Sequence, residues 1–155
     1  MGEELDSRTV YDPVSKSIKV KLPIDKAFAL FTEGIASWWP LESHSVGEEK
    51  TIKCIFEGEV GGRIYEVQED GNEAEWGRVK TWDPPDSVVF TWYPGREADT
   101  AQDVDVKFTS IEDGTELQLV HSGWELLGDQ AHEMREGYDS GWDYVLGHYY
   151  ADVNK

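Results

Sequence analysis

The chain has 155 residues, a length that fits one compact domain with a hydrophobic core. Its 32 Asp and Glu residues against 14 Lys and Arg give a formal net charge of -18, which repels phosphate backbones and anionic lipids. We therefore expect no nucleic-acid partner and no membrane partner. Hydrophobic residues make up 39% of the chain and aromatic residues 12%, which is far more apolar than an acidic disordered segment.

Motifs for metals, phosphates and nucleophilic catalysis are absent from the sequence. It has no CxxC, no HExxH, no aspartate-rich calcium loop, no glycine-rich phosphate loop and no GxSxG, and its four histidines lie far apart. We therefore expect neither a metal nor a cofactor. A single cysteine, a polar amino terminus and the lack of a bilayer-spanning apolar stretch predict a cytoplasmic protein.

The amino-terminal region predicts one strand and two short helices. Residues 1–13 are interpreted as a polar tail and residues 14–155 as a single domain. Apolar residues alternate over 17–22, which is typical of a strand with one buried face. A helix is expected over 24–31, followed by a helical turn over 35–39 that Pro40 stops.

Residues 51–124 predict an antiparallel meander of short strands. Turn residues separate segments in which apolar and polar residues alternate, so each strand has one apolar face and the sheet needs one cover. The segment 76–82 is ambiguous, because Trp76 and Trp82 share a face with Arg78 and Lys80. The tryptophans lie either outside as an exposed ladder with these cations or inside; we expect the small residues of the other face, Gly77 among them, to be inside.

The cover is predicted by the last segment, a long amphipathic helix from Asp129 onward. Its apolar residues recur at steps of three and four, and a kink near Gly141 is plausible because glycine disfavours helix. The predicted fold class is α+β, a helix-grip fold: a curved antiparallel sheet around a long C-terminal helix, with two short helices after the first strand.

Several segments resemble a known family: LFTEGIASWWPLESHSVG (30–47), EVGGRIYEV (59–67), EWGRVKTWDPPDSVVFTWYPG (75–95), DGTELQLVHSGWELLG (113–128) and EGYDSGWDYVL (136–146). The family is that of the homologues of the activator of the heat-shock protein ninety ATPase (AHSA-type), within the START-like (SRPBCC) superfamily. The resemblance implies a seven-stranded sheet around the terminal helix, with a cavity for hydrophobic small molecules. Eukaryotic members carry an additional amino-terminal domain for the chaperone contact, so the family name does not transfer that activity.

Inward-facing aromatic residues are candidate ligand contacts, because a sheet that curves around a helix leaves space that side chains line. An aromatic core and an aromatic-lined pocket look the same in sequence, so both interpretations stay open. The predicted ligand-binding residues are Trp39, His44, Cys54, Phe56, Glu66, Phe90, Trp92, Leu119, His121, Met134, Tyr138 and Trp142.

The polar members of this set have alternative roles. His121 could bind a ligand carbonyl or act as a general base, or it could be satisfied by the backbone. His44 lies either at a cavity mouth or in an ordinary loop, and Glu66 projects either into the pocket or outside. Cys54 is interpreted as a small buried hydrophobe and not as a nucleophile.

Three functions follow from these features. The first is a binding protein for a small hydrophobic molecule, the second is a cyclase- or hydrolase-type enzyme that uses the same cavity, and the third is a chaperone-associated module that binds a protein partner. The enzyme requires His121 and Glu66 to converge on one ligand position. The partner module requires a contact such as the acidic surface or an exposed patch of Trp76 and Trp82. Either a monomer or a homodimer is compatible with the sequence.

Overall fold

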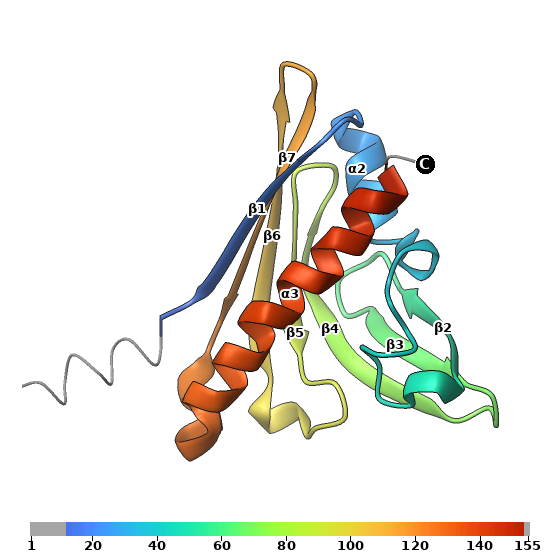
Figure 1. Ribbon diagram of the computed structural model, residues 1–155, viewed down its shortest axis with the longest axis vertical. Helices are drawn as coiled ribbons and strands as arrows, with labels where there is room; N and C mark the ends of the chain where they lie inside the picture. The colour runs from blue at the N-terminus through green and yellow to red at the C-terminus, as the bar shows by residue number, and fades with distance from the viewer. Residues whose placement is uncertain (1–11, 154–155) are drawn as a thin grey trace, which may run out of the picture.

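Seven antiparallel strands form one curled sheet in the computed structural model, which describes residues 12–153 (Figure 1). The strand order is β1-β7-β6-β5-β4-β3-β2. The predicted tail, residues 1–13, lies mostly outside the described residues. The strands are β1 (Val14–Val20), β2 (Thr51–Phe56), β3 (Arg63–Gln68), β4 (Glu73–Asp83), β5 (Ser87–Trp92), β6 (Gln102–Ile111) and β7 (Gly114–Ser122).

The cover of the sheet is α3 (Ala131–Val153), the long helix that lies across one face in Figure 1. It begins after a 3₁₀ segment, Trp124–Gln130, in which Gly128 adopts a positive φ of 57°. That backbone conformation favours glycine and breaks the helix, so α3 starts two residues later than expected. The helix continues through Gly141 to Val153. The predicted helix-grip architecture is confirmed.

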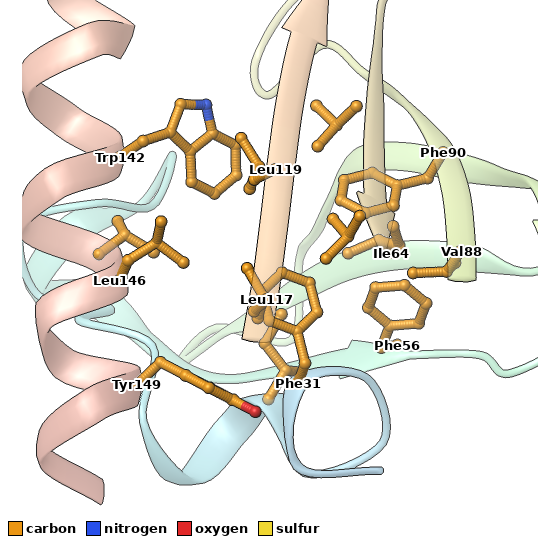
Figure 2. Close-up of a cluster of buried hydrophobic side chains, with 14 of the residues drawn as sticks. Phe31, Phe56, Ile64, Val88, Phe90, Leu117, Leu119, Trp142, Leu146 and Tyr149 are labelled. Atoms are coloured by element: carbon orange, nitrogen blue, oxygen red, sulfur yellow. The ribbon is translucent and has the colours of Figure 1, made fainter. Parts of the chain in front are cut away.

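Aliphatic and aromatic side chains fill the space between α3 and the middle of the sheet. Figure 2 shows Trp142, Leu146 and Tyr149 of α3 facing Leu117 and Leu119 of β7. The Tyr149 hydroxyl donates a hydrogen bond of 2.7 Å to the carbonyl oxygen of Ala27 in α2 (Ile24–Phe31), the helix predicted at these bounds. This contact fixes the carboxyl half of α3 against α2. Among residues 12–153, no helix has the length and apolarity that crossing a bilayer requires.

Strand β4 meets the expectation that its small residues face inward only in part, because Gly77 and Val79 are buried but Thr81 is exposed. The pairing register shifts by one residue at Trp76 against β3 and at Lys80 against β5, so each is the extra residue of a β-bulge. The inward positions therefore fall three residues apart: Trp76 and Val79 are buried, and Trp82 is half-buried against Phe28. The prediction of an exposed tryptophan ladder is wrong. Each bulge adds one residue to the strand, so the residues that face inward no longer alternate in steps of two.

Replacing Gly77 by Ala is expected to destabilise the protein by about 3 kcal/mol, because the new methyl group would overlap the backbone of β5. A Cβ at this position would lie 1.8 Å from the carbonyl oxygen of Thr91. The measurement is urea denaturation followed by tryptophan fluorescence. Gly147→Ala is the matched control, since a Cβ there meets nothing within 4 Å on an exposed part of α3, and it should stabilise by about 0.5–1 kcal/mol. Equal stability of the two variants would contradict the described packing.

Candidate functional site

A mainly apolar cavity of about 320 Å³ lies between the amino half of α3 and the β2–β5 side of the molecule. Its volume is at the lower end of the range, about 300–1,000 Å³, that small-molecule sites occupy. Side chains from α3, from β5 and the loop after it, and from the loop before β2 line it: Trp39, His44, Ser45, Val46, Trp92, Pro94, Gly95, Tyr138, Gly141, Trp142 and Val145.

Three indole rings form much of the cavity wall. The ring centroid of Trp39 lies 5.8 Å from that of Trp92 and 6.0 Å from that of Trp142, and the Trp92 and Trp142 centroids are 5.7 Å apart. All three side chains are at least 92% buried, so their positions are set by packing. Each indole therefore exposes only a small, rigid apolar part of its ring toward the cavity.

Gly141 explains why α3 does not fill this space. A Cβ at Gly141 would meet no heavy atom within 4 Å, although the residue sits on the face of α3 that borders the cavity. Further along the helix, Leu146 and Tyr149 are buried in the core and do not line the cavity. The helix therefore packs closely along its carboxyl half and leaves room where it carries glycine.

A buried carboxylate fastens the loop that borders the cavity on one side. Glu66 of β3 is fully buried. Its oxygens accept hydrogen bonds from the backbone N–H groups of Val46 and Gly47, at 2.7 and 2.8 Å, and from the Trp76 indole at 2.7 Å. The Thr51 hydroxyl and the Gln68 amide donate two more. Because Val46 lines the cavity, this carboxylate ties the cavity rim to the sheet.

The hydrogen bonds keep Glu66 ionised despite its burial. Burial alone would raise the pKa of the carboxyl group, but the donors from Gln68, Trp76, Val46 and Gly47 outweigh it and lower the pKa below its ordinary value of 4.5. The group is therefore a structural anion at neutral pH and holds no proton to donate.

A second buried network lies behind the α3 side of the cavity. His121 is fully buried, and burial, with the nearby charge of Arg96, lowers its pKa to about 3. The ring is therefore neutral: Nδ1 accepts a 2.9 Å hydrogen bond from the Trp142 indole, and Nε2 carries the hydrogen that faces Gln102 Oε1 at 3.3 Å. The network thereby orients Trp142, a wall residue of the cavity.

Arg96 connects this network to Tyr138. Its Nη2 donates to Gln102 Oε1 at 3.3 Å, to the carbonyl oxygen of Trp92 at 3.2 Å and to the Tyr138 hydroxyl at 3.4 Å. Its Nη1 donates to the carbonyl and hydroxyl oxygens of Thr100, both at 3.2 Å. The guanidinium thus spans the loop between β5 and β6 and reaches the hydroxyl of a cavity residue.

The other rim of the cavity is held by stacked rings. His44 lies nearly parallel to Tyr144 of α3, with ring centroids 4.7 Å apart and an interplanar angle of 17°. Partial burial and the nearby His148 lower the pKa of His44. The Trp39 indole donates to the carbonyl oxygen of His44 at 2.7 Å, so the same loop position is attached both to α3 and to the cavity wall.

The twelve predicted ligand contacts separate into two groups. Trp39, His44, Trp92, Tyr138 and Trp142 line the cavity. The other seven are not among its lining residues in the described chain; six are buried and Met134 is half-buried against the core: Cys54, Phe56, Glu66, Phe90, Leu119, His121 and Met134.

The polar residues of the second group occupy separate positions. His121 and Glu66 belong to different networks and do not meet over the cavity, so the acid and base required for the predicted enzyme are not brought together. Burial and the Glu66 charge raise the pKa of the Cys54 thiol to about 12, so it is not a thiolate at neutral pH. Among residues 12–153, no three His, Cys, Asp or Glu side chains cluster to hold a metal ion.

Sequence reasoning missed several residues of the site. Val46, Pro94 and Gly95 line it from loops, where no periodicity marks an inward position. Arg96 carried no motif, and only its spatial approach to Tyr138 gives it a role. Gly141 was noticed as a helix-disfavouring residue, and the space beside it could have been suggested by that signal.

Comparison with protein families matches residues 21–148 to the family described as activator of Hsp90 ATPase homolog 1-like protein. The chain belongs to this family. The resemblance drawn from the sequence segments is thereby confirmed. No curated protein sequence matches the chain.

Solved structures similar to this member of the activator of Hsp90 ATPase homolog 1-like family include an enzyme. The anthrahydroquino-γ-pyrone synthase Txn09 is 34% identical, with a TM-score of 0.58, over 83% of this chain and 87% of its own. The Aha1 dimer from Colwellia psychrerythraea is 17% identical, with a TM-score of 0.67, over 91% of this chain and 95% of its own. DynU16 of the dynemicin biosynthetic locus is also 17% identical, with a TM-score of 0.67. The match includes 93% of this chain and 48% of DynU16. The last two share the fold.

Glu66→Gln is expected to destabilise the protein by about 3 kcal/mol at pH 7, because an amide leaves part of the buried donor set without an acceptor. Folding lowers the pKa of Glu66. The carboxylate therefore contributes to the free energy of unfolding above pH 4.5, and this contribution is lost as the pH falls through the folded-state pKa. The difference between wild type and variant should therefore shrink on acidification below pH 4.5. The measurement is urea denaturation as a function of pH.

Glu69→Gln serves as the control for this experiment, because it removes one negative charge from an exposed position next to the same strand. It should change the unfolding free energy by less than about 0.5 kcal/mol. A pH-independent difference for Glu66→Gln, or no difference at pH 7, would show that the carboxylate does not hold the loop in this way.

Proposed function

We propose that the protein binds a small, flat, mostly apolar molecule in the cavity between the sheet and α3. The observation that carries the proposal is the cavity itself, in which the rings of Trp39, Trp92 and Trp142 border a space that Gly141 leaves open. Affinity would come from apolar burial, worth about 25 cal/mol for each Å² removed from water, and from ring contacts with the indoles.

A planar polycyclic ligand suits these surroundings. Three indoles packed on one another give the space rigid apolar walls, and few polar groups border it. The name of Txn09, a synthase of an anthrahydroquino-γ-pyrone, supports a fused-ring ligand for this chain as well. We place this binding in the cytoplasm, as expected from the sequence.

A second candidate is a cyclase-type enzyme that uses the same cavity. The 34% identity with Txn09 favours it. His121 and Glu66 would not provide its acid and base, since neither lines the cavity. Any chemistry would instead depend on positioning a reactive ligand against the indoles and the Tyr138 hydroxyl.

The partner-binding alternative loses one of its predicted surfaces, because Trp76 is buried and Trp82 is half-buried. The family name and the Aha1 dimer support the part of this alternative in which the chain binds another protein or a second copy of itself.

Filling the cavity should abolish binding of N-phenyl-1-naphthylamine, a neutral dye whose fluorescence rises in apolar surroundings. Gly141→Leu places an isobutyl group in the open space, and we expect at least a tenfold loss of dye affinity. The matched control is Gly137→Leu, one turn earlier on α3, where a Cβ also meets nothing within 4 Å but the residue does not line the cavity. It should bind the dye within twofold of wild type. Equal binding by all three proteins, or none by wild type, would overturn the proposal.

A natural ligand should remain associated with protein purified gently from its own source. Native mass spectrometry of that protein is expected to show an added mass that disappears in Gly141→Leu and persists in Gly137→Leu, because only the first substitution fills the cavity. An added mass that is unaffected by Gly141→Leu would place the bound molecule elsewhere.

A further inference from the structure

The cavity contains a hydroxyl group whose hydrogen has no acceptor in the described part of the chain. Tyr138 lines the cavity, and its oxygen accepts a hydrogen bond from Arg96 Nη2 at 3.4 Å. Among the hydrogen bonds of residues 12–153, none has the Tyr138 hydroxyl as donor. A phenolic hydroxyl both accepts and donates, so this group keeps its donor capacity for a molecule in the cavity.

Arg96 gives that donor an unusual electrostatic setting. The protein has a net charge of -18, yet the hydrogen bonds of the Arg96 guanidinium all go to neutral acceptors: the carbonyl of Trp92, both oxygens of Thr100, the Gln102 amide and the Tyr138 hydroxyl. No salt bridge neutralises it among the described residues. A cation that donates to a hydroxyl oxygen polarises the O–H bond and strengthens the hydroxyl as a donor.

The cavity also lacks carboxylate groups that would repel an electron-rich ligand. None of its described lining residues is Asp or Glu, although the chain has 32 of them. The Trp92 side chain, which lines the cavity and is 97% buried, has an indole N–H with no hydrogen-bond partner among residues 12–153. That N–H is itself covered by protein, so the donor that the cavity offers to a ligand is the Tyr138 hydroxyl, and no carboxylate among the described lining residues opposes it.

We propose that the Tyr138 hydroxyl, positioned by Arg96, is the specificity-determining donor that selects planar ligands carrying a ring carbonyl or phenolate oxygen. This inference rests on the proposed binding function and adds the chemical class of the ligand. Tyr138 contacts the ligand oxygen, whereas Arg96 acts through Tyr138 and is a positioning residue. In a ligand that undergoes ring closure, the same donor would stabilise negative charge on that oxygen.

The test compares two molecules that differ at one atom group. Fluorenone and fluorene are flat tricycles of nearly the same shape, with a carbonyl in the first where the second has a methylene. Both are used to displace N-phenyl-1-naphthylamine from wild type, Tyr138→Phe, Arg96→Gln and a control, Tyr150→Phe. Tyr150 lies on the same helix but is exposed and does not line the cavity.

Wild type and Tyr150→Phe are expected to bind fluorenone about five- to tenfold more tightly than fluorene, the effect of one directed hydrogen bond. In Tyr138→Phe the preference should fall to within twofold while fluorene affinity stays unchanged. Arg96→Gln should give an intermediate preference. The carbonyl stretching band of bound fluorenone should lie at lower wavenumber in wild type, return toward its free value in Tyr138→Phe and shift partly in Arg96→Gln.

The results separate this inference from the proposed function. Equal affinity of fluorene and fluorenone for wild type, or a preference that Tyr138→Phe retains, would overturn the role of Tyr138 while leaving the cavity as a binding site. A carbonyl band that Arg96→Gln does not move would overturn the positioning role of Arg96. Failure of wild type to bind either compound or the dye would overturn the proposed function together with the inference.

Discussion

The ionised carboxylate of Glu66, buried in the sheet and surrounded by donors, is the interaction on which the cavity depends. A buried charge is tolerated only when hydrogen bonds replace its lost water, and here backbone N–H groups of Val46 and Gly47 provide two of them. The carboxylate therefore fixes a loop without regular secondary structure. Because Val46 forms part of the cavity rim, one buried anion determines where the mouth of the site lies.

On the α3 side, a hydrogen-bond network built around an uncharged histidine performs the corresponding task. His121 accepts from Trp142, and Gln102 accepts from both His121 and Arg96, so a chain of hydrogen bonds runs from one cavity residue to the guanidinium that meets another, Tyr138. Keeping His121 uncharged makes this arrangement possible, because an imidazolium has no nitrogen free to accept from an indole. The histidine orients a wall residue of the cavity, and aromatic rings and a hydroxyl border the open space itself.

The sequence predicted most of the fold and less than half of the candidate site. Strict apolar alternation and helical spacing report local burial, so α2 was predicted at its observed bounds and the antiparallel meander in the part of the chain that forms β2 to β7. Strand β4 was misjudged, since the bulges at Trp76 and Lys80 arise from pairing with two neighbours and leave no signal in local periodicity. Inward direction was also a poor guide to the site: Phe56, Phe90 and Leu119 point inward but are buried in the core.

By itself, the sequence determined the architecture, the family and the aromatic character of the interior, because these depend on periodic patterns within single elements and on segments that are continuous in the chain. Only the tertiary structure decided which aromatic residues border open space and which are packed. That outcome depends on volumes shared by distant segments, such as the room that Gly141 leaves opposite Trp39 and Trp92. The same holds for Arg96 and Tyr138, 42 residues apart, whose hydrogen bond exists only because the loop after β5 folds back against α3.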